Sequence, residues 1–264
     1  MQRGAGRAPK RERIQKLLAA RGIGSRRQVE AWITEGRITV NGKLASPGQP
    51  VRERDDVRLD GRRLRLELGS DAPHRGMAYH RPAQEGLRAS ADDPAPGAIE
   101  KLPKAGGQRW IPVSPLPARD GGLELFVTDG ALAAALTRNG FAISSEFSVR
   151  VRGAFDDADI AGRIQAALEK GAAKGRVESV TAAGGEGRNR WLHVIAAGLR
   201  PGDLRLAFEH CDLEPNRILR TRYGPIAMDR ALARGRSRPL TAGELVSLRD
   251  AAQVMPGRSR MPAR

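Results

Sequence analysis

The chain has 264 residues and a formal net charge of +16, from 46 Lys and Arg against 30 Asp and Glu. This charge favours a polyanionic partner, and nucleic acid more than an acidic membrane surface. No apolar run approaches a membrane span and the start, MQRGAGRAPKRER, lacks the apolar stretch of a signal peptide, so we expect a cytoplasmic protein without membrane contact. One cysteine excludes an internal disulfide, and the four histidines lack metal-ligand spacing, so no metal is expected.

The positive charge is concentrated at the start of the chain. Residues 1–68 hold 17 basic and 8 acidic side chains, a net +9, and the rest of the chain contributes +7. The polar stretch GSDAPHRG then lacks apolar periodicity and indicates a boundary near residue 70. The predicted organisation is a disordered basic N-terminus (1–9), a small domain (10–68), a linker (69–76), a larger domain (77–252) and a disordered basic tail (253–264).

Two short helices and two hairpins are predicted for the small domain. Apolar residues recur at helical spacing over 14–18, and Ser25 can cap a second helix. The Asn-Gly and Asp-Gly pairs at 41–42 and 60–61 are two-residue turn signals between alternating segments. Basic side chains accompany all of these elements, although a basic run alone is about as often a solubilising surface as a phosphate contact.

The segment RIQKLLAARGIGSRRQVEAWITEGRITVNGK resembles an S4 RNA-binding domain in its first helix, its G-x-x-SRR helix start and its GR-x-x-VNG strand and turn. The resemblance implies a structured RNA ligand, most often ribosomal, bound on the face made by the two helices. Because basic side chains outnumber aromatic ones here, shape and backbone contacts are the expected mode. The residues expected to contact RNA are Arg13, Lys16, Ser25, Arg26, Arg27, Arg37, Asn41 and Lys43.

In the larger domain, the segment WIPVSPLPARDGGLELFVTDG at 110–130 carries two β-prone runs around a proline-containing loop. After Gly121-Gly122, apolar residues at 123, 125 and 127 alternate with the others, and both runs are predicted to be strands of one sheet. Loops between rigid strands are where catalytic groups usually lie, yet this loop offers Asp120 as its one acid.

The succession of segments over roughly residues 75–250 resembles the catalytic domain of the RsuA/RluB-type ribosomal RNA pseudouridine synthases, in which an S4 module is the usual partner. The resemblance implies an α+β fold: a small S4 domain of the α-L type, then a mixed, mainly antiparallel sheet. The implied reaction needs no cofactor. An aspartate attacks the ribose or removes its proton while the uracil is detached, rotated and rejoined through carbon.

The family loop V-G-R-L-D-x-x-T-x-G aligns without a gap on VSPLPARDGG and places the catalytic aspartate on Pro117. Ser114 and Pro115 replace the family's Gly and Arg, and Asp120 replaces its Thr. Proline can serve neither as nucleophile nor as base, so we predict no catalytic residue. Asp120 is more simply a turn residue than a substitute acid, because three loop residues can displace a carboxylate by up to about 10 Å.

Two further motifs differ from the family pattern. The tyrosine expected to stack on the target base is Phe147, which keeps the ring and loses the hydroxyl. The basic segment that faces the catalytic aspartate keeps Arg205 but has Leu206 as its neighbour. We expect Phe147 and Arg205 to line one concave basic surface with the loop 115–122, as a remnant active-site cleft.

The sequence therefore predicts a monomer that binds structured, ribosomal RNA and has lost isomerase activity. One alternative is an active 23S or 16S ribosomal RNA isomerase with Asp120 as a relocated acid, for which a carboxylate in contact with Arg205 is the discriminating observation. Another is a ribosome assembly factor that acts on precursor particles mainly through its S4 domain.

Overall fold

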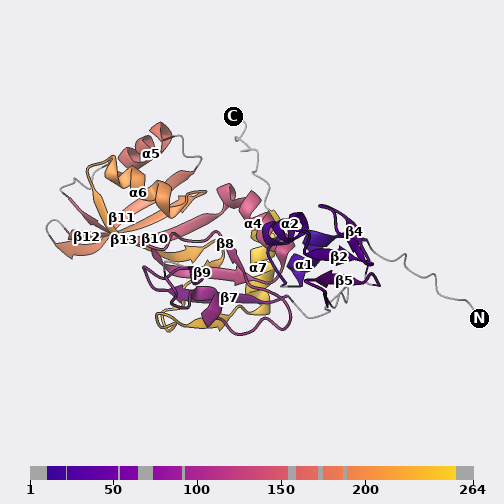
Figure 1. Cartoon of the computed structure of the whole chain (residues 1–264). Coiled ribbons are helices and arrows are strands. Elements are labelled where there is room, and N and C mark those ends of the chain that lie inside the picture. The colour runs from indigo at the N-terminus through magenta and orange to yellow at the C-terminus, as the bar shows by residue number, and fades with distance from the viewer. Residues whose placement is uncertain are drawn as a thin grey trace, which may run out of the picture. The chain divides into compact units, whose positions relative to one another are not determined.

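A computed structural model describes residues 11–21, 23–52, 54–64, 74–90, 93–153, 159–171, 175–186 and 189–253 (Figure 1). The chain divides into two compact units, one of Met1–Pro73 with Lys104–Arg109 and the other of His74–Pro103 with Trp110–Arg264. The division falls within the predicted linker, whereas the grouping of Lys104–Arg109 with the first unit was not expected from the sequence. The predictions for residues 1–9, for most of the linker and for 254–264 lie outside the described residues.

The small unit has two helices beside short antiparallel strands. Its elements are β1 (Glu12–Arg13), α1 (Ile14–Ala20), α2 (Arg26–Thr34), β2 (Ile38–Val40), β3 (Lys43–Leu44), β4 (Pro50–Val51), β5 (Val57–Leu59) and β6 (Arg62–Arg63). The strands pair in the order β3-β2-β5-β6, and β1 pairs with β4. Side chains from α1, α2, β2, β4 and β5 share one core.

Local signals explain this unit well. The hydroxyl of Ser25 accepts a hydrogen bond from the N–H of Gln28 at 3.1 Å and caps α2, as predicted. The residues at 41–42 have φ of 52° and 80°, and those at 60–61 have φ of 49° and 77°, so both two-residue turns are confirmed.

The large unit is built on one mixed sheet. Its strands are β7 (Gly76–Arg81), β8 (Ile111–Val113), β9 (Gly121–Val127), β10 (Ser144–Arg152), β11 (Arg176–Glu186), β12 (Asn189–Ala197), β13 (Glu214–Tyr223), β14 (Ile226–Ala227) and β15 (Ser237–Pro239). Its helices are α3 (Ala98–Lys101), α4 (Gly130–Arg138), the 3-10 turn η1 (Gly140–Ala142), α5 (Ile160–Lys170), α6 (Pro201–Glu209) and α7 (Ala242–Gln253). The order β11-β12-β10-β13-β9-β7-β15, with β9 and β13 parallel, confirms the predicted α+β class.

Helices cover opposite faces of the two halves of this sheet. Phe147 on β10 belongs to the core formed with α5 and α6, which lie over β10 to β13 in Figure 1, whereas Leu123 on β9 belongs to the core formed with α4 and α7. Gly122 pairs with Arg220, and Arg220 pairs with Phe147, so these three residues share a face and Leu123 points to the other one. The face of β10, β12 and β13 away from α5 and α6 is therefore a separate surface.

Strand β9 is confirmed as a strand that pairs with β8, and all seven of its residues are buried. The alternation over 123–127 places the apolar residues against α4 and α7, but Glu124 on the other face is also 0% exposed. It lies between the guanidinium groups of Arg81 and Arg220. Charged partners, rather than water, thus cover the polar face of the strand.

Candidate functional site

The loop 114–120 is held from one side by Arg81, which is 1% exposed. Its Nη2 donates to the carbonyl oxygens of Leu116 at 2.8 Å, Pro117 at 2.5 Å and Asp120 at 3.2 Å. One buried amino group of Arg81 thus shares its two hydrogens among three carbonyl oxygens of the loop, and opening the loop would leave this donor unsatisfied.

A second buried arginine, Arg220, holds the start of the same loop through its Nη1, which donates to the carbonyl of Ser114 at 2.8 Å. Glu124 joins the two arginines, with carboxylate oxygens 3.4 Å from Arg81 and 3.7 Å from Arg220, and also accepts the N–H of Leu116. Burial raises the pKa of Glu124 to about 7 even though both guanidinium groups act to lower it. The polar network is thus internal to the unit.

Backbone geometry supports the gap-free alignment of this loop. Ser114 has a φ of +48°, in the left-handed region, where the family pattern has glycine. Gly122 has a φ of +98°, and a Cβ there would lie 2.3 Å from the carbonyl oxygen of Arg220. Both positions at which the family pattern has glycine therefore adopt left-handed or positive φ values that suit glycine.

Asp120 does close a turn, since its N–H donates to the carbonyl of Pro117 at 3.1 Å, but it is more than a turn residue. Its side chain is 0% exposed, and its Oδ1 lies 2.5 Å from Nη2 of Arg205 on α6. Arg205 also donates to the carbonyl of Pro215. The second carboxylate oxygen has no hydrogen-bond partner among the described residues. The pair ties the start of β9 to α6, and it is the carboxylate contact with Arg205 that discriminates in favour of a relocated acid.

The remnant cleft is closed. Phe147 is 1% exposed and packs in the core beneath α5 and α6, and Arg205 is 8% exposed. Two strand spacings, about 10 Å, separate Phe147 from Gly122, because Arg220 lies between them in register. The structure thus brings the loop 114–120 and Arg205 together. The predicted open concave surface is wrong, because the side chains of Phe147 and Arg205 are both turned into the interior. Leu206, in contrast, is 54% exposed.

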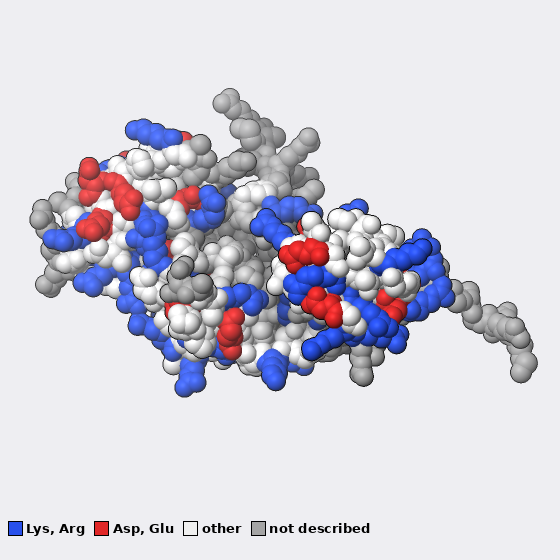
Figure 2. Space-filling model, in the orientation of Figure 1, with Lys and Arg blue, Asp and Glu red and all other residues white. Residues whose placement is uncertain are grey.

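Four of the eight residues predicted to contact RNA on the small unit present free cations. Arg13, Arg26, Arg27 and Lys43 are exposed and form no ion pair with any carboxylate in the described part of the chain. Figure 2 shows basic side chains gathered on this unit, toward β4 and β5. These side chains can meet phosphates without first breaking an internal contact.

The other four already have intramolecular partners. Ser25 caps α2, and Lys16 is paired with the glutamate four residues before it, at the start of β1. Arg37 donates to Asp60 at 2.7 and 2.9 Å, and that hydrogen bond is the main reason that its pKa is raised. Asn41 bridges the neighbouring loop through the side chain at 55 and the N–H at 56. The side chains of these four residues are held by contacts within the unit, so they contribute less free positive charge to its surface.

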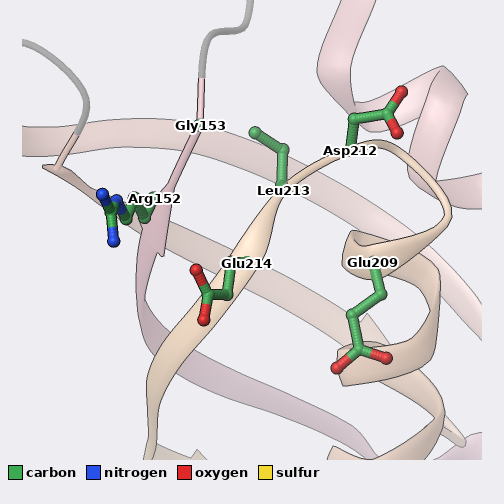
Figure 3. Close-up of a pocket in the computed structure, with 6 residues that line it drawn as sticks. All are labelled: Arg152, Gly153, Glu209, Asp212, Leu213 and Glu214. Atoms are coloured by element: carbon green, nitrogen blue, oxygen red, sulfur yellow. The ribbon is translucent and has the colours of Figure 1, made fainter.

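A pocket of about 380 Å³ lies at the ends of β10 and β13 (Figure 3), lined by Arg152, Gly153, Glu209, Asp212, Leu213 and Glu214. Three of its four charged side chains are acidic, and their negative charge would repel a phosphate group. Within the ranges that the structure describes, no cluster of three or more His, Cys, Asp or Glu could hold a metal ion, and no helix is long and apolar enough to cross a membrane.

Comparison with known proteins agrees with this architecture. Residues 12–57 match the S4 domain family. The chain is 37% identical over 251 residues to the ribosomal large subunit pseudouridine synthase B of Pseudomonas aeruginosa, covering 94% of the chain and 64% of that relative, less than two thirds of its length. It is 35% identical over 252 residues to the protein of the same name from Escherichia coli K12, covering 93% and 84%. A crystal structure of a pseudouridylate synthase has the same fold, with a TM-score of 0.54 at 17% identity over 89% of this chain and 99% of that one.

Proposed function

Because the chain belongs to the ribosomal large subunit pseudouridine synthase B family, we propose that it binds structured ribosomal RNA and does not convert uridine to pseudouridine. The S4 domain is the main anchor, and the protein acts as a cytoplasmic monomer without cofactor. Ribosomal RNA of the large subunit, free or in precursor particles, is the ligand that the names of the relatives favour.

One observation carries the loss of activity: Pro117 occupies the aspartate position of the motif, on a loop that has positive φ at both glycine positions of the pattern. The acid that remains nearby is 0% exposed, and the ring at Phe147 is 1% exposed, so neither can touch a ribose or a base in this conformation. Acid, base or nucleophilic catalysis requires hydrogen-bond reach to the reacting group.

The Asp120–Arg205 contact favours the second candidate, an isomerase with a relocated acid. The same contact has a structural explanation. A buried arginine without a partner costs about 3–5 kcal/mol, and Arg205 would be unpaired once the family aspartate was lost. A carboxylate at 120 restores the charge balance without reaching the surface. We therefore favour the structural role.

The proposal is tested by incubating the full chain with protein-free ribosomal RNA from cells that lack large-subunit pseudouridine synthases. Gel-shift titration should show stoichiometric binding, and nucleoside mass spectrometry should show no new pseudouridine. A chain lacking residues 1–70 should bind this RNA much more weakly. Unchanged binding by the truncated chain would remove the S4 domain as the main anchor.

A further inference from the structure

The open face of the large sheet carries a ladder of two arginines and a tryptophan. Arg150 on β10 lies directly opposite Trp191 on β12 and Arg217 on β13. Their neighbours Val149, Leu192 and Ile218 point into the core under α5 and α6, so the ladder faces the other way. Arg150 is exposed, and the other two side chains are partly exposed.

The two arginines form an unfavourable pair within the fold. Residues directly opposite on antiparallel strands have Cβ atoms about 5 Å apart, where like charges destabilise the sheet. Burial, Arg234 and Arg150 each lower the pKa of Arg217, which places a third guanidinium close by. Such a cluster favours an external anion.

The carboxylates on β10 and β13 form no ion pair with these arginines among the described residues. Glu146 on β10 accepts Arg222 at 2.7 Å and His193 at 3.3 Å. Glu214 lies opposite Arg152, one step further along the ladder. Within the described residues, Arg150, Arg217 and Arg234 form no ion pair, so the nearby acids leave this cluster uncompensated.

We propose that this face of β10, β12 and β13 is a second RNA contact, with backbone phosphates bound between Arg150 and Arg217 and an unpaired base stacked on Trp191. The inference rests on the proposed function, since it assigns part of the same RNA to the large unit. Figure 2 shows basic side chains along the underside of the large unit below these strands.

The chemistry of the ladder indicates single-stranded RNA. Guanidinium groups bind phosphates, and an aromatic ring beside them stacks on any base, which is how sequence-tolerant single-strand sites are built. The closed loop 114–120 has no part in this surface, so binding here needs none of the groups of the remnant cleft.

The test measures fluorescence anisotropy of a labelled oligouridylate of roughly 20 nucleotides with the full chain, from about 50 to 200 mM salt. Arg150→Gln with Arg217→Gln should weaken binding about tenfold at the low-salt end and reduce the salt slope by about 1.4, which is about 0.7 for each lost phosphate contact. Trp191→Leu should weaken binding about fivefold or more with an unchanged slope.

The matched control is Arg138→Gln with Lys170→Gln, which removes the same charge from exposed positions on α4 and α5. It should leave the slope unchanged. The double ladder variant should keep or raise the melting temperature, since it removes a like-charge pair. Binding equal to that of the control, or a loss of binding together with a lowered melting temperature, would overturn the inference.

The two proposals fail separately in this design. Arg26→Ala with Arg27→Ala tests the S4 anchor on structured ribosomal RNA, and the ladder variant is also measured in that background. The ladder effect on oligouridylate should be the same in both backgrounds, because contacts that share no partner contribute independently. Failure of the S4 variant alone leaves the ladder inference standing.

Discussion

Two sets of basic residues in this protein differ in what surrounds them. Arg26, Arg27 and Lys43 of the small unit are exposed and have no carboxylate partner among the described residues. Arg81 and Arg220 of the large unit are buried, and their guanidinium groups bind backbone carbonyls and Glu124. The first set can attract a polyanion, and the second fixes a loop. Net charge alone therefore does not measure RNA-binding capacity.

The largest expected effect comes from breaking the buried pair. Arg205→Met leaves Asp120 charged and unpaired in the interior, which should lower the free energy of unfolding by about 3–5 kcal/mol in a urea titration. The double variant Asp120→Asn with Arg205→Met should recover most of the loss. A single-variant cost below about 1 kcal/mol would show that the pair does not hold the loop.

Gly122→Ala tests the positive φ at the second glycine position of the loop pattern. The position needs φ of +98°, and the added Cβ would overlap the backbone of Arg220, so we expect a cost of about 3 kcal/mol in unfolding free energy. Gly184→Ala is the control, with a φ of +114° and no atom within 4 Å of the added Cβ. It should cost only about 1 kcal/mol. Equal costs would contradict the close approach of β9 and β13.

Glu124 should give the large unit a pH-dependent stability. Burial raises its pKa from 4.5 to about 7, so the folded state holds a proton that the unfolded chain releases between these values. The contribution of this pKa shift to the free energy of unfolding is fully present below about pH 4.5. It declines by up to about 1 kcal/mol per pH unit as the pH rises to 7. In Glu124→Gln this decline should vanish from a series of urea titrations.

Glu244 supplies the control of opposite sign. Arg238 lowers the pKa of Glu244 to about 2, so its contribution is present above pH 4.5 and is lost as pH falls toward 2. Glu244→Gln should leave the pH 4.5 to 7 window unaltered. A persistent decline in Glu124→Gln would assign the effect to another group.

The smallest expected effect concerns the exposed set. Arg26→Ala with Arg27→Ala should weaken binding to structured ribosomal RNA about tenfold, roughly 1.4 kcal/mol, and reduce the salt slope by about 0.9 for each lost contact. Thermal unfolding should be unchanged, since neither side chain has an ion-pair partner among the described residues. Unchanged affinity and slope would show that these cations only solubilise the unit.

Local signals made the small unit predictable. A capping serine, two turn dipeptides and an apolar helical period each act within a few residues, and the structure confirms all of them. The large unit depends on contacts distant in sequence. Asp120 meets a residue 85 positions away, and the arginine at 81 binds carbonyls 35 to 39 positions away. Alternation over β9 therefore predicted a strand but not the charge network on one of its faces.

Dependence on contacts distant in sequence also explains why the remnant cleft was predicted only in part. Sequence alignment placed loop and arginine in one site, and Arg205 does contact Asp120. The alignment could not show that Phe147 packs inward. A phenylalanine in place of the family's tyrosine is compatible with either stacking on a base or burial in a core. Side-chain burial is set by what covers the strand, which here is α5 and α6.

Pseudouridine formation under single-turnover conditions tests the central claim most directly. The full chain, in excess over undermodified ribosomal RNA, is incubated for hours and the RNA is analysed by nucleoside mass spectrometry. We expect no pseudouridine above the level without protein, and little gain from Pro117→Asp, because catalytic groups that act as a unit are not additive. Robust pseudouridine formation by the unaltered chain that Asp120→Ala abolishes would contradict the account and make Asp120 a relocated catalytic acid.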